Sequence, residues 1–244
     1  MPDYSLYPDI DYSLGFTTRG CIRNCDFCVV PQKEGRVRKV QHPSEFHDPK
    51  FSKIMLLDNN ITSLNKGKWF FEVTDWINDE KLQCDFQSGI DIRLMTPEIA
   101  ERIKETKTFK PWKFAYDNTK DTDAILAGIE MLKAAGVNPR QCLFYVYVHD
   151  DDDVPIKAAH CDILKMHGAT AYSMVNRDVK QTHDMRKIAR YTRPMLFWTK
   201  NDRGDHIQFW DYCSVINSDN RTQSLLEMFS GNCDGDGEII DTEA

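Results

Sequence analysis

Apolar runs of strand character alternate along this chain with segments of helical periodicity, and this alternation limits the fold more than any other feature. It is typical of parallel βα units, in which each helix returns the chain to the start of the next strand. Six strands are expected, at residues 12–18, 53–58, 84–92, 112–116, 142–148 and 170–175. Helices are expected between them, at residues 43–47, 65–78, 97–106, 121–135 and 155–166.

Local signals mark several of these boundaries. Thr96 precedes Pro97, which predicts an N-cap followed by proline at the first helical position. Gly136 and Gly168 each follow a helical pattern and predict helix ends.

Short connections and right-handed crossovers make strands that are consecutive in the chain neighbours in space. We therefore predict an α/β fold, a partial (β/α)6 barrel of the TIM type, with fewer units than the eight of a closed barrel. The expected organisation is a core over residues 1–178, a C-terminal extension over 179–230 that covers the barrel, and an acidic, mobile tail over 231–244. Functional residues should gather at the carboxyl ends of the strands.

Cys21, Cys25 and Cys28 directly follow the first expected strand, in the run GFTTRGCIRNCDFCVVP. Iron–sulfur clusters are held by cysteine thiolates, usually four, so three leave one iron open to a substrate or cofactor. A structural zinc site is the alternative, but it needs four ligands, and the chain has no second Cys-x-x-Cys. The remaining cysteines stand singly and are expected to be ordinary thiols rather than ligands of a second cluster: Cys84, Cys142, Cys161, Cys213 and Cys233.

The spacing Cys-x-x-x-Cys-x-x-Cys, with the aromatic Phe27 just before the last cysteine, resembles the hallmark of the radical S-adenosylmethionine (SAM) superfamily. The resemblance implies that Cys21, Cys25 and Cys28 hold a 4Fe-4S cluster whose open iron chelates SAM. It further implies reductive cleavage of SAM to a deoxyadenosyl radical, which removes a hydrogen atom from the substrate, and an electron donor such as flavodoxin or ferredoxin. It extends over roughly residues 12–178, since the core of the superfamily is a partial barrel of six βα units.

Two segments are candidates for SAM contacts. The family's glycine-rich SAM segment follows the second strand, where this chain has Asp58 and Asn59 but no glycine, so only the location carries over. The third expected strand ends in QSGIDIR, and alternation places Gln87, Asp91 and Arg93 on one face. If that face is the barrel lumen, Arg93 would pair with the SAM carboxylate and Asp91 with a ribose hydroxyl. A solvent-exposed pair of Asp91 and Arg93 is the alternative.

Further strand ends supply candidates for the substrate pocket, each of which could instead serve packing or helix capping. They are Tyr116, Asp117, Tyr145, Tyr147, Asn176 and Arg177.

The net charge of −7 disfavours binding of extended duplex nucleic acid and favours a small-molecule or nucleotide substrate. A second hypothesis is a nucleic-acid substrate whose target base is flipped out, because the segment from Lys33 to Lys39 is basic and could contact it. An iron–sulfur electron carrier or a zinc-binding module is the non-enzyme alternative.

The cluster loop is also similar to those of methylthiotransferases and cobalamin-dependent radical SAM enzymes. Because no additional domain is evident, we expect a stand-alone catalytic core. No apolar stretch approaches the roughly 20 residues of a membrane span, and the N-terminus has no secretory pattern, so we expect a cytoplasmic protein without a membrane partner.

Overall fold

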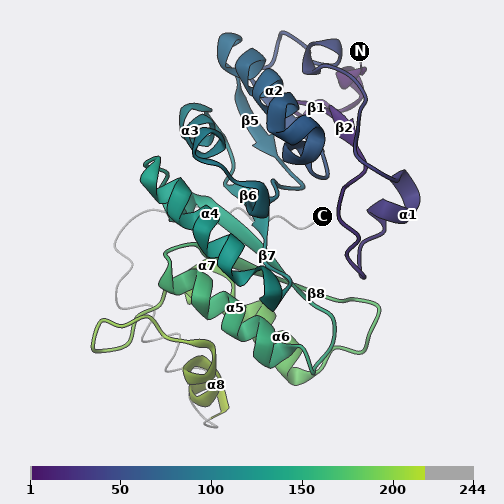
Figure 1. The fold of residues 1–244 in the computed structure, drawn as a ribbon. Coiled ribbons are helices and arrows are strands. Elements are labelled where there is room, and N and C mark those ends of the chain that lie inside the picture. Colours follow the sequence, from purple (N-terminus) through teal and green to yellow (C-terminus); the bar gives the residue numbers. More distant parts are fainter. Residues whose placement is uncertain (1, 218–244) are drawn as a thin grey trace.

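Two parallel three-stranded sheets frame the protein in the computed structural model, which describes residues 2–217 (Figure 1). The first sheet has the order β1-β4-β5, from Ser13–Gly15, Lys53–Leu56 and Gln83–Phe86. The second has the order β6-β7-β8, from Trp112–Ala115, Cys142–Val148 and Thr170–Val175. A short antiparallel pair, β2 (Thr18–Arg19) and β3 (Arg38–Lys39), stands beside them. The mixed α/β class with parallel strands is confirmed.

Backbone contacts join the two sheets in chain order. The N–H of Ile90 donates to the carbonyl of Lys113 at 2.9 Å, and Cys84 forms an isolated parallel bridge with Thr108. Gly89 makes this approach possible, because its φ is +96° and a Cβ there would lie 2.7 Å from the Lys113 carbonyl oxygen. Among the strands of residues 2–217, none pairs β8 with β1, so the described sheet is open at its ends.

Helices connect the parallel strands and cover one side of the sheets (Figure 1). The α-helices are α1 (Val30–Glu34), α2 (Lys68–Asp79), α3 (Pro97–Glu105), α4 (Thr122–Ala134), α5 (Val154–Met166), α6 (His183–Tyr191), α7 (Pro194–Phe197) and α8 (Phe209–Asn217). Short 3-10 helices span Tyr4–Leu6, Pro43–Glu45, Ile61–Gly67, Ile92–Leu94, Thr119–Asp121 and Pro139–Gln141. None of these helices is long and apolar enough to cross a bilayer.

One apolar core holds the helices against the strands. Helix α2 buries Phe70, Val73 and Ile77 at helical spacing, and these side chains belong to the same cluster as Ile54 and Leu56 of β4. Full burial of each such side chain contributes about 1.5–3 kcal/mol. The core therefore fixes the strand ends that carry the polar residues described below.

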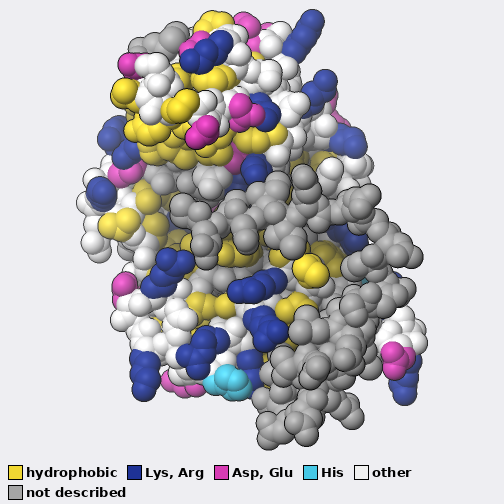
Figure 2. Space-filling view, turned by 180° about the vertical axis from the view of Figure 1, so that it is seen from behind, with side chains coloured by type: hydrophobic (Ala, Val, Ile, Leu, Met, Phe, Trp, Pro, Cys, Tyr) yellow, Lys and Arg dark blue, Asp and Glu magenta, His cyan; other side chains and the backbone are white. Residues whose placement is uncertain are grey.

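The sheet face away from the helices is less covered. On β8, Tyr172 and Met174 are 48% and 46% exposed and alternate with the buried Ala171 and Ser173. Figure 2 shows the molecule from behind, where apolar side chains lie among lysines and arginines. The helices thus cover one face of β8 more fully than the other.

Several boundaries expected from the sequence are confirmed. The Thr96 hydroxyl accepts a hydrogen bond from the N–H of Ile99 at the start of α3. Gly136, with φ +79°, donates its N–H to the Lys133 carbonyl after α4, and Gly168 has φ +81° after α5. The predicted bounds of β7 and β8 are those observed.

Several predictions about the N-terminal half are wrong in their bounds: the second strand ends at Leu56, and the helix expected over 43–47 is a 3-10 helix over Pro43–Glu45. The third strand ends at Phe86, because Gly89 turns the chain and a 3-10 helix begins at Ile92. The alternation that placed Gln87, Asp91 and Arg93 on one strand face therefore does not apply. The helix expected from residue 65 begins only at Lys68, since Asn65 and Lys66 have positive φ. The first strand covers only Ser13–Gly15, and Thr18 opens β2.

The extension after β8 packs beside the sheet. Helix α6 contacts β8 and α5, and α8 contacts α5 and α6. The Thr192 hydroxyl accepts the Ser173 N–H at 3.0 Å, which satisfies a donor of β8. The rest of the extension and the predicted acidic tail lie outside the described residues.

Candidate functional site

The three cysteines lie on a loop that begins at β2 and ends at α1. Cys21 donates its N–H to the Gly35 carbonyl at 3.1 Å, and Cys28 donates its N–H to the Cys25 carbonyl at 3.0 Å. All three thiols are half-buried and free. Burial raises the pKa of the Cys25 thiol, and the positive charge of Arg93 acts against this rise. The loop therefore presents three partly accessible thiols close to an arginine.

Asp58 anchors the base of this loop from the end of β4. Its carboxylate accepts hydrogen bonds from the backbone N–H and the hydroxyl of both Thr17 and Thr18. Burial raises the pKa of Asp58, while these hydrogen bonds lower it. Asn59 beside it donates Nδ2 to Glu34 at 2.8 Å. Both residues proposed for SAM contacts thus bond to the segments that flank the loop, and they do not line the cleft described next.

Asp91 joins the loop to the segment after β5. Its Oδ2 accepts from Arg23 Nε at 2.8 Å and from Asn60 Nδ2 at 3.1 Å, and its Oδ1 accepts from Arg93 Nε at 2.7 Å. Arg93 also donates Nη1 to Asp121 at 2.8 Å. Burial raises the pKa of Asp91, but the hydrogen bonds and charges of Arg93 and Arg23 outweigh it, and the net pKa lies below the ordinary value.

A cleft of about 520 Å³ opens beside the loop at the carboxyl ends of the strands. The cysteine loop borders it with Arg23, Asn24, Cys25, Asp26 and Phe27. The segments after β5, β6 and β7 border it with Arg93, Asp117, Asn118, Lys120, Asp121, His149 and Asp153; β7 adds Tyr147 and α5 adds Lys157. Four predicted site residues, Phe27, Arg93, Asp117 and Tyr147, are thus brought together with Cys25.

Two contacts shape the wall of this cleft. The Phe27 and Tyr147 rings stack with centroids 4.3 Å apart, so the residue before the last cysteine lies against the end of β7. Asp117 accepts the Tyr147 N–H at 2.9 Å, and its backbone carbonyl accepts from Lys157 Nζ at 2.5 Å. Burial raises the pKa of Asp117 above its ordinary value.

Arg23 and Lys157 line the cleft but were not predicted from the sequence as site residues. The sequence offers a signal for each, because Arg23 stands between two candidate ligands and Lys157 interrupts the apolar positions of α5.

The other predicted residues lie outside this cleft. Gln87 is exposed. Tyr116 is fully buried and stacks on His160 at 3.9 Å between centroids. Tyr145 meets Tyr172 edge to face on the neighbouring strand, Asn176 is half-buried after β8, and Arg177 is exposed.

The arrangement of the cysteine loop limits the kind of metal site that it can form. Within residues 2–217, no three His, Cys, Asp or Glu side chains converge as a single ion requires. A lone zinc ion needs such convergence, because all of its ligands bind one atom. In a four-iron cluster each thiolate binds its own iron, so convergence on one atom is not what that ligand set requires.

Neither a scan against protein-family models nor a search of curated proteins finds a match to this chain.

Proposed function

We propose that this chain is a radical SAM enzyme in which Cys21, Cys25 and Cys28 hold a 4Fe-4S cluster and the adjoining cleft takes SAM and substrate. One observation carries the proposal: a loop with three half-buried thiols borders a cleft at the carboxyl ends of parallel strands. Active sites of parallel α/β folds lie at this end. We infer further that the two sheets together form one partial (β/α)6 barrel.

The residues of the chain have distinct tasks under this proposal. When bound, the cluster would supply the electron for reductive cleavage of SAM. Arg93 offers a planar cation for the SAM carboxylate, although Asp91 and Asp121 already engage its fork. Phe27 and Tyr147 would limit the access of water to the cleft. Asp117, whose pKa is raised by burial, can keep or accept a proton near the substrate.

Anaerobic reconstitution of the protein with iron and sulfide tests the proposal. The parent should gain iron and a visible absorbance band, and with SAM and a reductant it should release deoxyadenosine. Alanine in place of Cys21, Cys25 or Cys28 should remove both the iron and the absorbance. The matched controls Cys161→Ala and Cys213→Ala, at buried cysteines distant in the chain from the loop, should keep them. Parent-like iron content in any of the three loop variants would overturn the ligand assignment.

The substrate we favour is a small molecule or nucleotide, with flavodoxin or ferredoxin as electron donor and the cytoplasm as location. A nucleic-acid substrate is the second candidate, because the exposed basic residues Arg36, Arg38 and Lys39 stand beside the cysteine loop. Binding of a single-stranded RNA oligonucleotide that weakens as salt rises, and that is lost on alanine substitution of all three, would favour this second candidate.

A further inference from the structure

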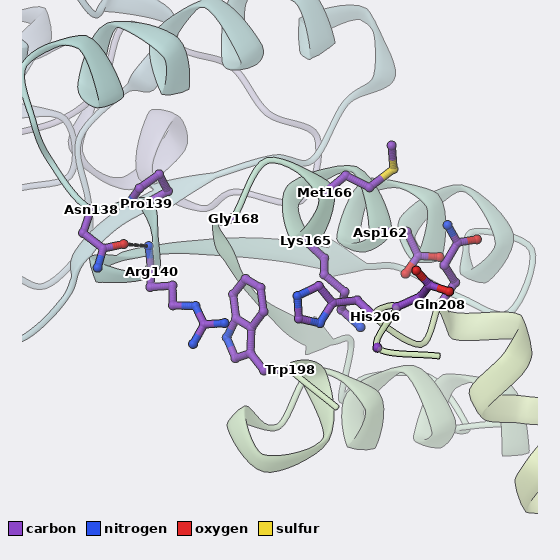
Figure 3. Close-up of a pocket in the computed structure, with 12 residues that line it drawn as sticks. Asn138, Pro139, Arg140, Asp162, Lys165, Met166, Gly168, Trp198, His206 and Gln208 are labelled. Atoms are coloured by element: carbon purple, nitrogen blue, oxygen red, sulfur yellow. Dashed lines mark hydrogen bonds between the residues drawn. The ribbon is translucent and has the colours of Figure 1, made fainter. Parts of the chain in front are cut away.

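A second cleft, of about 530 Å³, lies at the opposite end of β7 and β8 from the cysteine loop (Figure 3). It is bordered by the turn before β7, the end of α5 and the segment 198–208. The seven residues of β7 separate the two clefts by roughly 20 Å. Its volume is in the range of small-molecule sites. The proposed radical chemistry makes no use of it.

Arg140 is one of the residues that line this cleft. The guanidinium carbon Cζ lies 4.4 Å from the centre of the Trp198 ring, and this cation–π contact holds the Arg140 side chain in place. No carboxylate within residues 2–217 forms an ion pair with it. In Figure 3 the side chains of Arg140, Trp198 and His206 gather at one part of the cleft.

His206 adds a second polar group to the wall of this cleft. Its Nδ1 is buried and has no hydrogen-bond partner among the residues that the structure describes. Its ring meets Trp198 at 5.4 Å between centroids. Burial lowers the pKa of His206, and the positive charges of Lys200, Lys165 and Arg140 lower it further, while a hydrogen bond with the Thr199 backbone acts against them. Three cations thus act on this imidazole.

Lys165 supplies charge behind these groups without being available itself. It is buried, and its Nζ donates to the Tyr191 hydroxyl and to the Ile207 carbonyl, each at 2.6 Å. The nearby Asp162 is occupied, since it accepts from the Tyr191 hydroxyl and the Phe209 N–H. Asp205, which is exposed, is the other carboxylate on the cleft wall.

We propose that this cleft binds a small oxyanion, a carboxylate or a phosphate monoester, through the Arg140 guanidinium and the His206 imidazole. An arginine fork matches either group with two parallel hydrogen bonds. An anion there would also offset the positive charges that act on His206.

Nuclear magnetic resonance of the histidine ring protons of the full chain tests this proposal, with the His206 signal assigned from a His206→Gln variant. The protein is titrated with inorganic phosphate and, separately, with acetate, at ionic strength held constant with chloride. We expect a saturable shift of the His206 signal and a rise in its pKa with the preferred anion. Saturation by phosphate but not acetate identifies a phosphate site, and the reverse identifies a carboxylate site.

Substitutions at Arg140 separate a built site from general attraction. Arg140→Ala should weaken anion affinity roughly tenfold or more, and Arg140→Lys by less, because lysine keeps the charge but loses the fork. The matched control Arg186→Ala removes an exposed arginine on α6, outside the cleft, and should change nothing. Equal affinity in the parent and Arg140→Ala, or an unchanged His206 signal with both anions, would overturn the proposal.

Discussion

Arg23 and Asp91 join the cysteine loop to the sheet: Arg23 lies between Cys21 and Cys25, and its Nε donates to Asp91 Oδ2 at 2.8 Å. The Asp91 side chain is only 3% exposed, whereas that of Arg23 is 34% exposed. Asn60, which donates to the same oxygen, also lies 3.7 Å from the Cys21 sulfur. Asp91 thus holds the middle of the loop, as Asp58 holds its base.

Removing the Asp91 carboxylate should therefore loosen the loop. In Asp91→Ala, Arg23 loses its partner while Arg93 keeps Asp121, and we expect a loss of about 3 kcal/mol in the free energy of unfolding. Urea unfolding measures this loss, and iron content after reconstitution should fall with it. Asp26→Ala, an exposed site in the same loop, should preserve both. Parent-like stability and iron content in Asp91→Ala would show that the loop is held by other contacts.

The stacking of Phe27 on Tyr147 should be measurable as a coupling energy. A double-mutant cycle with Phe27→Ala and Tyr147→Ala, followed by urea unfolding, should yield about 0.5–1.5 kcal/mol. Tyr147→Phe keeps the ring and should keep the coupling. Additive effects of the two alanines would mean that the rings contribute nothing to each other.

Gly89 should tolerate no side chain. Gly89→Ala places a Cβ in a left-handed conformation and 2.7 Å from the Lys113 carbonyl oxygen, so we expect a cost above about 2 kcal/mol. Gly136→Ala is the control, because φ there is +79° but the nearest atom is the flexible Lys104 side chain at 3.8 Å. It should cost about 1 kcal/mol. Equal costs, measured by chemical unfolding, would argue against a close contact between the sheets at Gly89.

His160 should make stability fall on acidification. Burial lowers the pKa of His160 to about 4, and the charge of Lys157 acts in the same direction. The unfolded chain binds this proton near pH 6.5, so stability is fully present above that pH and is lost as the pH falls toward 4. The loss reaches about 3 kcal/mol at most.

Unfolding in urea at pH 7.5 and pH 5 compares the two conditions. His160→Gln should flatten the difference, whereas His183→Gln, at an exposed histidine, should leave it as in the parent. A pH dependence that is the same in His160→Gln and the parent would assign the effect to other groups.

Arg93 is expected to contribute to SAM binding under the proposed function. Arg93→Ala should weaken binding to the reconstituted protein on the order of ten- to a hundredfold, and Arg93→Lys less, as measured by calorimetry. The iron content serves as the control, since it shows whether the cluster has been kept. If SAM affinity is unchanged at normal iron content, Arg93 does not bind SAM and serves only its ion pairs with Asp91 and Asp121.

Local chemistry made much of the frame predictable. The bounds of β7 and β8 follow from runs of strand-forming residues, and α3 begins where a threonine cap meets a proline. These signals act between near neighbours in the chain, through φ and ψ preferences and capping hydrogen bonds. The three cysteines likewise lie within a few residues of one another, so the iron–sulfur site could be predicted from their spacing alone.

The order of the parallel strands, the helix ends and the loop that carries three thiols could be predicted from residue patterns alone. The contacts between distant segments depend on the folded chain. Arg23 and Asp91 are 68 residues apart, and Thr17 and Asp58 are 41 apart. Asp58 and Asp91 were expected to contact SAM; in the structure Asp58 bonds to the base of the cysteine loop and Asp91 bonds to the loop through Arg23. Gly89, which has no Cβ, lets the Lys113 backbone approach closely. No local preference encodes such partners, since they meet only after the apolar core has brought the strand ends together.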